Sequence, residues 1–371
     1  MARLVLITGG AGFIGSHLAD ELLRRGDRVR VLDVLSPQVH EDGRRPDYLD
    51  PAVELVVGDV RDGSAVRRAL AGADAVVHLA ARVGVGQSMY RVADYEAVNA
   101  LGTAVLLEAL IDKPVSRLVV ASSMSIYGEG LYRTAAGEPV DGVERDASAL
   151  RRGDWQVRGP DGEPLEPVPT PETKRPALAS VYALSKYEQE RLCLLVGAAY
   201  GIETVALRFF NVYGPRQALS NPYTGVIAIF AARLLNGRPP MVFEDGFQQR
   251  DFVSVHDVAR ACVQAIESPA APGKAYNIGS GRAVTIRHVA ERLAELLERP
   301  DLPPDITGKY RVGDVRHCFA DISRARQDLG FVPQVTWDDG LTELAAWLEG
   351  RMALDRVEEA SAELAARGLT V

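Results

Sequence analysis

A glycine-rich segment directly after the first apolar run is the feature that most constrains the fold of this chain. Residues 8–15 read TGGAGFIG, with Gly9, Gly12 and Gly15 between a β-branched run and an amphipathic stretch. Glycines at this spacing permit a tight turn and a close approach of the backbone to a pyrophosphate, which the N-terminus of the next helix stabilises. The sequence therefore predicts a strand, a phosphate-binding turn and a helix in that order.

The same alternation continues through the first half of the chain and predicts an α/β fold. We expect a doubly wound parallel sheet of the Rossmann type, followed by a smaller C-terminal substrate-binding lobe. Residues 130–176 interrupt the alternation with many Pro, Gly and charged residues, so we expect an irregular insertion or flap there. The expected strands are 3–8, 28–32, 53–57, 75–79, 118–121 and 204–208, and the expected helices are 14–25, 64–71, 95–110 and 182–200.

These elements suggest a division of the chain into domains. We assign residues 1–206 and 241–270 to a dinucleotide-binding domain that carries the flap. Residues 207–240 and 271–350 are expected to form the smaller lobe, and residues 351–371 a helical tail.

Composition limits the partners of the chain. A net charge of -8 over 371 residues provides no excess of basic side chains for nonspecific binding of nucleic acid. No apolar run reaches the roughly 18 residues of a membrane span, and the N-terminus lacks the pattern of a signal peptide. The three cysteines, Cys193, Cys262 and Cys318, have no metal-binding spacing. We therefore expect a cytoplasmic protein with no metal, nucleic-acid or membrane partner.

Two acidic residues follow expected strands and bear on the dinucleotide. Asp33 ends the second strand, where a carboxylate can accept both ribose hydroxyls of the adenosine. It would repel a 2′-phosphate, and Val34 and Leu35 provide no cation to hold one, so NAD is preferred over NADP. Asp59 follows the third strand and is either a contact for the adenine amino group or a helix N-cap or turn residue.

Catalytic side chains are indicated by the segment YALSK at residues 182–186. It places Tyr182 and Lys186 on one face of a helix, where the ammonium group can favour the phenolate of a residue that otherwise titrates near pH 10. The strand that ends in ASSMSIYG, residues 121–128, brings Ser123 to the carboxyl edge of the sheet. There it can bind the oxygen that Tyr182 deprotonates.

Together these segments resemble the extended short-chain dehydrogenase/reductase family, and within it the nucleotide-sugar epimerases and dehydratases. The resemblance extends over residues 3–345 and includes HLAA at 78–81, RFFNVYGPRQ at 208–217, RDFVSVHDVA at 250–259, NIGSG at 277–281 and GDVRH at 313–317. It implies an NAD-dependent enzyme that acts on a sugar carried by a nucleoside diphosphate.

The resemblance also assigns roles to individual residues. Two arginines and an amide among them suit a buried diphosphate. The implied catalytic residues are Ser123, Tyr182 and Lys186. The residues implied to line NAD are Gly9, Gly12, Phe13, Ile14, Asp33, Asp59, Val60, Leu79, Ala80, Ala81, Asn99, Ser122, Tyr182 and Lys186. The residues implied to contact the substrate are Val85, Ser123, Asn211, Phe243, Arg250 and Arg316.

Met124 and Ser125, directly after Ser123, favour one reaction within this family. The resemblance implies that a hydride leaves sugar C4 for NAD⁺ while Tyr182 takes the hydroxyl proton. The 4,6-dehydratases of the family carry an Asp-Glu pair at positions 124 and 125, and the decarboxylating members a Glu nearby. Met124 and Ser125 cannot act as that acid and base, whereas return of the hydride to the other face of a rotated 4-keto sugar needs no further group. We therefore expect epimerisation at C4.

The substrate and the assembly are expected from the resemblance alone. The flap and residues 208–226 resemble bacterial epimerases of dTDP-L-rhamnose, so we expect a dTDP-6-deoxyhexose, with the flap helping to close the sugar site. A UDP-hexose or UDP-uronate 4-epimerase, an NAD(P)H-dependent 4-ketosugar reductase, a 4,6-dehydratase and a non-catalytic sugar-nucleotide-binding regulator remain open. The helices at 95–110 and 182–200 are expected to pair across a twofold axis in a homodimer.

Overall fold

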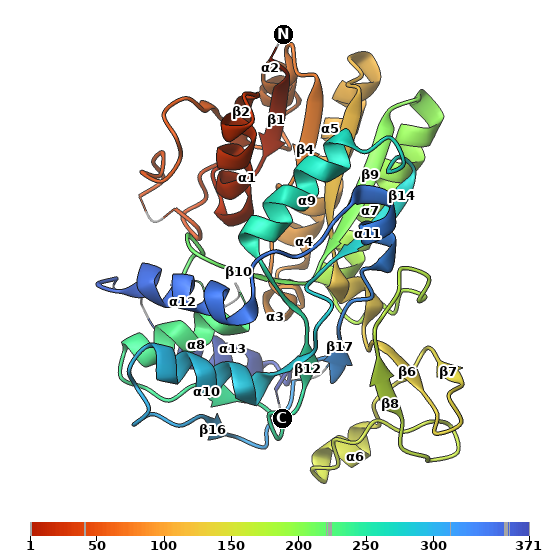
Figure 1. Cartoon of the computed structure of the whole chain (residues 1–371), viewed down its shortest axis with the longest axis vertical. Helices are drawn as coiled ribbons and strands as arrows, with labels where there is room; N and C mark the ends of the chain where they lie inside the picture. The colour runs from red at the N-terminus through yellow and green to blue at the C-terminus, as the bar shows by residue number, and fades with distance from the viewer. Residues whose placement is uncertain are drawn as a thin grey trace.

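Seven parallel strands form the central sheet of the computed structural model, in the order β3-β2-β1-β4-β5-β9-β14 (Figure 1). The structure describes residues 2–40, 42–219, 221, 225–311, 313–351, 355 and 357–370. This strand order is that of a Rossmann fold, so the expected fold class is confirmed. The strands are β1 (Leu4–Thr8), β2 (Arg28–Asp33), β3 (Glu54–Val57), β4 (Ala75–His78), β5 (Arg117–Ser123), β9 (Glu203–Phe209) and β14 (Lys274–Ile278).

Helices cover both faces of this sheet, because successive side chains of each strand point to opposite sides. Val5 and Ile7 of β1 pack into one apolar cluster with helices α1 and α9, whereas Leu6 packs into another with α2, α5 and α7. The covering helices are α1 (Phe13–Arg24), α9 (Val255–Glu267), α2 (Gly63–Leu70), α5 (Gly102–Asp112) and α7 (Val181–Tyr200). Shorter helical segments are α3 (Val85–Ser88), α4 (Val92–Tyr95), η1 (Glu96–Leu101), η2 (Met124–Tyr127) and α11 (Ser323–Leu329).

The register of the strands brings their carboxyl ends together at one edge. Thr8 of β1 lies opposite Leu32 of β2 on one side and His78 of β4 on the other, and His78 lies opposite Val120 of β5. The segments that follow these strands therefore meet at one edge of the sheet, where open α/β sheets bind their ligands.

A second lobe lies beyond this edge, at the lower left in Figure 1. Its helices pack on a separate apolar cluster that includes Phe230, Leu293 and Leu344. No helix in the described part of the chain is long and apolar enough to cross a membrane. The helices are α8 (Val226–Leu235), α10 (Ile286–Leu296), α12 (Trp337–Leu348) and α13 (Val357–Ala366), and the short strands are β10 (Asn211–Tyr213), β11 (Met241–Val242), β12 (Gln249–Arg250), β13 (Phe252–Ser254), β15 (Val284–Thr285), β16 (Asp305–Ile306) and β17 (His317–Cys318).

The insertion at residues 130–176 is more regular than its sequence indicates. It forms a three-stranded antiparallel sheet, β7-β6-β8, and a short helix, and projects at the lower right in Figure 1. Tyr132, Val157 and Leu165 are buried together and give the flap a small apolar core. Its elements are β6 (Leu131–Arg133), β7 (Pro139–Val140), α6 (Ala147–Arg151) and β8 (Glu166–Val168).

The arrangement of the second half differs from the division expected from sequence. Strand β14 pairs with β9 in the central sheet, although residues from 271 onward were expected in the smaller lobe. Strands β11 and β12 pair with β16, β15 and β17 outside the central sheet, although they fall within the range 241–270. The chain therefore crosses between the two parts more often than a compositional boundary can show.

Candidate active site

The turn between β1 and α1 packs so closely against the backbone around it that two of its glycines have no space for a side chain. Gly9 has a positive φ of 69°, and a Cβ atom there would lie 2.8 Å from the Ala80 nitrogen. A Cβ on Gly15 would lie 2.4 Å from the Cα of Gly10. Gly12 caps α1 without a side chain, so the N–H groups of the first turn, which begins at Phe13 and Ile14, stay available. This cradle fits the pyrophosphate of a dinucleotide.

Asp33 lies at the end of β2, beside this turn. Its carboxylate accepts hydrogen bonds from the Ala11 N–H at 3.0 Å and the Leu35 N–H at 2.9 Å, which fix its orientation. The Tyr48 hydroxyl donates to the Ala11 carbonyl at 3.0 Å and braces the same turn. The half-buried Asp33 is therefore held in a fixed orientation beside the glycine-rich turn.

Asp59 is a turn residue in this structure, and the neighbouring Asp62 caps α2. Asp59 accepts the Arg61 N–H at 2.9 Å and pairs with its guanidinium at 2.6 Å. The hydrogen bond from the Arg61 side chain lowers the pKa of Asp59 below its usual range. Val60 is buried against α5, where a Cβ on Gly102 would lie 2.6 Å from Val60 Cγ1.

The segment after β4 and the strand β5 complete the expected cofactor wall. Leu79, Ala80 and Ala81 are half-buried beside the glycine turn. Ser122 is buried, and its hydroxyl donates to Glu190 at 2.6 Å.

Ser123 and Tyr182 meet through their side chains. Ser123 ends β5, and Tyr182 lies in the first turn of α7, whose N-cap is Ser180. Burial raises the pKa of the Tyr182 phenol, and its hydrogen bond with the Ser123 side chain counteracts that rise. The Tyr182 N–H donates to the Ser88 hydroxyl at 3.0 Å. Two hydroxyl groups are thus held together at the carboxyl edge of the sheet.

Lys186 is buried one turn further along α7 and belongs to a polar network. Its Nζ donates to Gln189 Oε1 at 2.6 Å, and Gln189 Nε2 donates to Thr103 Oγ1 at 2.9 Å. Burial lowers the pKa of Lys186 to about 8 and that of His78 to about 3. The ammonium is therefore held by an amide oxygen, beside an imidazole that stays neutral.

The contacts of His78 fix its tautomer. The Thr103 hydroxyl donates its proton to the Asn99 carbonyl at 2.5 Å, so Thr103 Oγ1 must accept from His78 Nε2–H at 2.9 Å. His78 Nδ1 is then the acceptor for the Thr8 hydroxyl at 2.7 Å, and Thr8 in turn accepts the Ala80 N–H at 3.2 Å. The network therefore runs from Lys186 to the backbone beside the glycine turn.

Asn99 anchors the loop that follows Ala81. Its amide accepts the Arg82 N–H at 2.7 Å and donates to Ser185 Oγ at 2.9 Å. Sequence reasoning found Asn99 but missed Gln189, Thr103 and Ser88. Thr103 stands in the mostly apolar sequence of α5, which was an available signal, whereas Gln189 lies among other polar residues of α7 and had none.

Among the residues implied to contact the substrate, Ser123 ends β5 and Val85 is exposed in α3. The other four, Asn211, Phe243, Arg250 and Arg316, lie on the lobe side of the edge. Arg250 and Arg316 lie next to each other where β12 pairs with β17, and Arg250 Nη1 donates to the Arg316 carbonyl at 3.0 Å. Asn211 Nδ2 donates to the Asp251 carbonyl at 2.8 Å. Phe243 lies under the Arg311 guanidinium, 4.4 Å from it. Residues 220 and 222–224 of the segment 208–226 lie outside the described residues.

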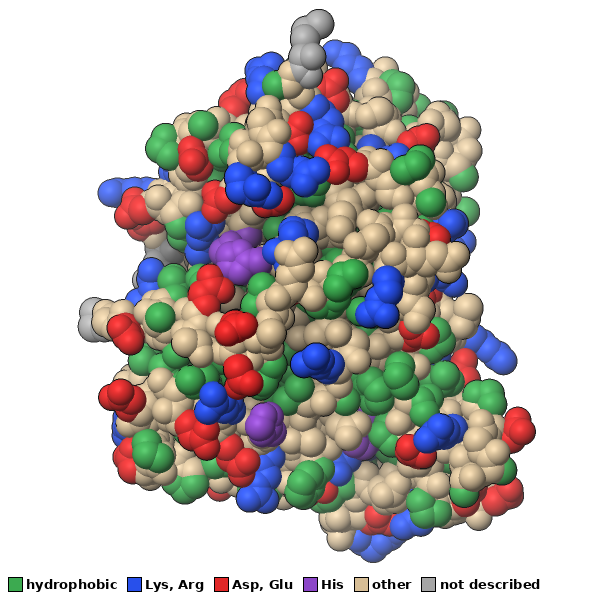
Figure 2. Space-filling model, viewed as in Figure 1, with side chains coloured by type: hydrophobic (Ala, Val, Ile, Leu, Met, Phe, Trp, Pro, Cys, Tyr) green, Lys and Arg blue, Asp and Glu red, His purple; other side chains and the backbone are tan. Residues whose placement is uncertain are grey.

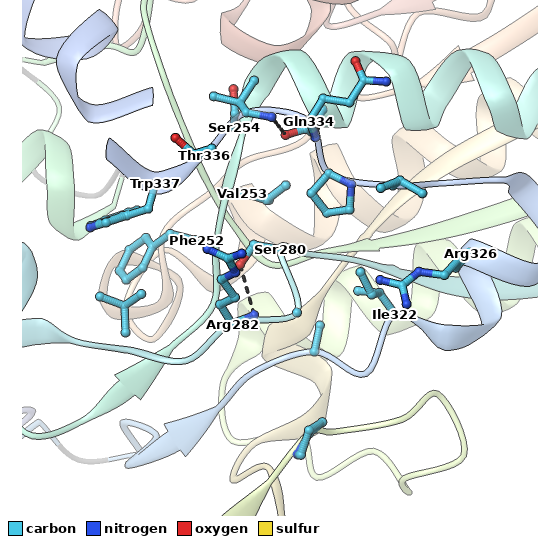
Figure 3. A pocket seen from close by; sticks show the side chains of 18 of the residues that line it. Phe252, Val253, Ser254, Ser280, Arg282, Ile322, Arg326, Gln334, Thr336 and Trp337 are labelled. Carbon is cyan, nitrogen blue, oxygen red and sulfur yellow. Dashed lines mark hydrogen bonds between the residues drawn. The ribbon is translucent and has the colours of Figure 1, made fainter. Parts of the chain in front are cut away.

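A separate cleft of 670 Å³ lies between α9 and the segment that precedes α12 (Figure 3). Phe252, Ser280, Arg282 and Trp337 line it together with further residues of the lobe. None of the implied catalytic or NAD-lining residues borders it, so it is distinct from the site above. Figure 2 shows acidic and basic side chains interspersed over the face viewed, with no broad basic patch.

Comparisons with known proteins agree with this geometry. Residues 5–149 and 156–279 match the NAD dependent epimerase/dehydratase family. The chain is 35% identical to a dTDP-L-rhamnose 4-epimerase of Burkholderia thailandensis, over 93% of this chain and 95% of that protein. It is 30% identical to a dTDP-glucose 4,6-dehydratase of an Actinoplanes species, over 92% and 97% of the two chains. It resembles the crystal structure of a Thermus thermophilus UDP-glucose 4-epimerase in complex with NAD, with a TM-score of 0.74, 32% identity and coverage of 94% and 100%.

Proposed function

Because this chain belongs to the NAD dependent epimerase/dehydratase family, we propose that it is an NAD-dependent nucleotide-sugar 4-epimerase whose substrate is a dTDP-6-deoxyhexose such as dTDP-L-rhamnose. The resemblance to the Burkholderia enzyme supports the substrate, and the Thermus enzyme makes a UDP-hexose the second candidate. We also propose that the protein is located in the cytoplasm and forms a homodimer.

The observation that carries the choice of epimerisation is the surroundings of Ser123. Met124 packs against the apolar core, and Ser125 has no ionisable group. The next carboxylate along the chain, Glu129, accepts the N–H groups of Arg316 at 2.6 Å and His317 at 3.2 Å, and the Tyr132 hydroxyl at 2.6 Å. Glu129 is thus held by contacts that fix the flap. The segment that directly follows Ser123 therefore offers no acid or base for the elimination of water or CO₂.

The chain's own residues perform the proton transfers. Ser123 holds the C4 oxygen of the sugar, and Tyr182 takes its proton and later returns it. A protonated Lys186 favours the Tyr182 phenolate against the effect of burial. Bound NAD supplies a reversible hydride acceptor for C4. NAD would be held by Gly9, Gly12, Asp33 and the other residues implied to line it. The diphosphate of the substrate would be held by Asn211, Arg250 and Arg316.

The test is to supply dTDP-L-rhamnose and its C4 epimer, dTDP-6-deoxy-L-talose, to protein that retains NAD, without added cofactor. We expect the same final ratio from either side and no uptake of solvent deuterium at C5. UDP-glucose and UDP-galactose in parallel distinguish the second candidate. A stable 4-keto-6-deoxy product from dTDP-glucose, or deuterium at C5, would show a dehydratase, and a need for stoichiometric NAD(P)H would show a reductase.

Substitution of the base gives the matched control. Tyr182→Phe should reduce turnover by about three orders of magnitude, within the range that general acid-base catalysis provides, while NAD stays bound. Tyr187→Phe, on the same helix, should retain turnover. If Tyr182→Phe turned over at the rate of the unsubstituted protein, the proposed catalytic role would be wrong.

A further inference from the structure

The flap inserts one arginine into the region of the expected diphosphate ligands. Arg145 precedes α6, yet only 8% of its side chain is exposed. Its Nη1 donates to Glu244 Oε1 at 2.7 Å, and its Nε lies 4.0 Å from Glu129 Oε1. A flap that served only as a cover would not need a buried cation.

Glu244 links this arginine to one of the expected diphosphate ligands. Its second oxygen accepts from Arg316 Nη1 at 2.9 Å, and the side chain is 3% exposed. Glu244 also adopts a positive φ of 54°, a conformation that costs free energy for a residue other than glycine. The backbone is thus held in a strained conformation where the carboxylate lies between Arg145 and Arg316.

Two donors in this cluster are left without an acceptor. Arg145 Nη2 and Arg316 Nε are buried and have no hydrogen-bond partner among the described residues. A buried donor without a partner costs free energy, so two of them on neighbouring guanidiniums indicate a place for acceptor oxygens from a ligand.

Each arginine of this cluster, Arg145 included, is paired with a carboxylate. Arg250 pairs with Asp314 at 3.3 Å, and Arg316 pairs with Asp245 at 2.6 Å as well as with Glu244. The positive charge of both arginines is therefore already compensated before a diphosphate binds. Burial lowers the pKa of His317, and the charges of Arg316, Arg250 and Arg145 lower it further, so all three guanidiniums act on one imidazole.

We propose that Arg145, carried by the flap, is a third arginine of the diphosphate site and donates its free Nη2–H to a phosphate oxygen of the nucleotide sugar. The inference rests on the proposed function. The base and the 6-deoxyhexose of such a substrate are neutral, so only the diphosphate can match a buried guanidinium in charge and as an acceptor. The flap thus contributes to affinity for the nucleotide.

The test is the binding of dTDP and UDP to the NAD-loaded protein by calorimetry. Arg145→Gln should lower the affinity for the nucleoside diphosphate by about tenfold or more, because a charge-assisted hydrogen bond is lost. Arg145→Lys should restore part of that affinity, because the charge returns without the planar donors. Arg133→Gln, which removes an exposed ion pair with Glu166 in the same flap, should leave affinity unchanged.

Tyr132→Phe separates a binding role from a structural one. It removes the hydroxyl that donates to Glu129 and so loosens the same cluster without removing the guanidinium. The inference would be overturned if Tyr132→Phe lowered the affinity for dTDP and UDP as much as Arg145→Gln does. It would also be overturned if Arg145→Gln bound both nucleotides with unchanged affinity. If Arg145→Gln does not fold, normal affinity of Arg145→Lys overturns it equally. If the unsubstituted protein bound neither dTDP nor UDP, the proposed function itself would fall, and the inference with it.

Discussion

Replacement of Gln189 should move the alkaline limb of the pH-rate profile. Gln189 Oε1 is the acceptor for the buried Lys186 Nζ at 2.6 Å, and burial already lowers the pKa of that lysine to about 8. Catalysis needs the protonated lysine, so turnover should fall as pH rises through about 8. In Gln189→Leu the ammonium loses its acceptor, and its pKa should fall further.

The size of the shift follows from the hydrogen bond. A bond to a charged group contributes about 1.5–3 kcal/mol, and 1.36 kcal/mol corresponds to about one pKa unit, so the limb should move to roughly pH 6–7. At pH 7.5 this reduces the protonated fraction, and with it turnover, by about three- to 25-fold. Gln189→Glu is the matched variant, because it keeps an acceptor and adds a negative charge that should move the limb above pH 8.

The assay is turnover of the NAD-loaded variants between pH 6 and pH 10, with NAD content measured in parallel. A merely structural role of Gln189 would lower turnover at every pH in both variants and leave the limb in place, which would refute the reasoning. The free energy of unfolding should change with pH in the opposite direction to turnover. Since the folded pKa of Lys186 is lower than the unfolded value of 10.5, the unfolded chain binds more protons between about pH 8 and 10.5, and this lysine contributes stability that rises with pH there.

Two further predictions concern the cofactor and the assembly. Asp33→Ala should lower the affinity for NAD about tenfold or more and the affinity for NADP much less, because it removes both the ribose-binding carboxylate and its repulsion of a 2′-phosphate. An equal loss of affinity for the two dinucleotides, measured by calorimetry, would contradict the assignment. Light scattering should give twice the chain mass of 40.1 kDa, because Leu184 and Leu195 of α7 are 46% and 58% exposed and suit an apolar interface. Leu195→Arg should yield monomers. A monomeric unsubstituted protein would refute the predicted homodimer.

The parts of the fold that depend on local pattern were predictable from the sequence. The expected six strands and four helices of the first half are present within a few residues of their predicted bounds, because apolar runs and helical periods mark them directly. Strand β14 was missed because KAYNI lacks a continuous apolar run and carries the polar Asn277, whose side chain donates to two backbone carbonyls inside the fold. The flap sheet was missed because its strands have two or three residues, too few for a period.

The candidate site divides in the same way. Ser123, Tyr182 and Lys186 could be proposed from the sequence because their motifs are local. Contacts between distant segments, such as Arg145 with Glu244 or Gln189 with Thr103, depend on how the elements pack and leave no local signature. Such residues become visible only when burial shows that a polar group needs a partner.

The tail residues 351–371 were expected only to be helical, and the structure packs helix α13 against α3, the segment that contacts Tyr182. Leu364 of α13 is 6% exposed and packs against Gly86 of α3, where a Cβ would lie 3.2 Å from Leu364 Cδ2. Tyr90, which follows α3, donates to Glu363 at 2.9 Å. Ser88 of α3 accepts the Tyr182 N–H, so α13 braces a segment that touches the first turn of α7.

Leu364→Asp should therefore reduce kcat/KM by about tenfold, because an unpaired carboxylate cannot stay buried against Gly86 and the loosened α3 no longer fixes Tyr182. Ala365→Asp places the same charge on the exposed face of α13 and should leave kcat/KM unchanged. The temperature of unfolding should change little in either variant, because no residue of α13 belongs to the two apolar clusters that cover the central sheet. Equal kcat/KM in the two variants would show that α13 does not position the catalytic tyrosine, and a large fall in the unfolding temperature of Leu364→Asp alone would show that it stabilises the whole fold instead.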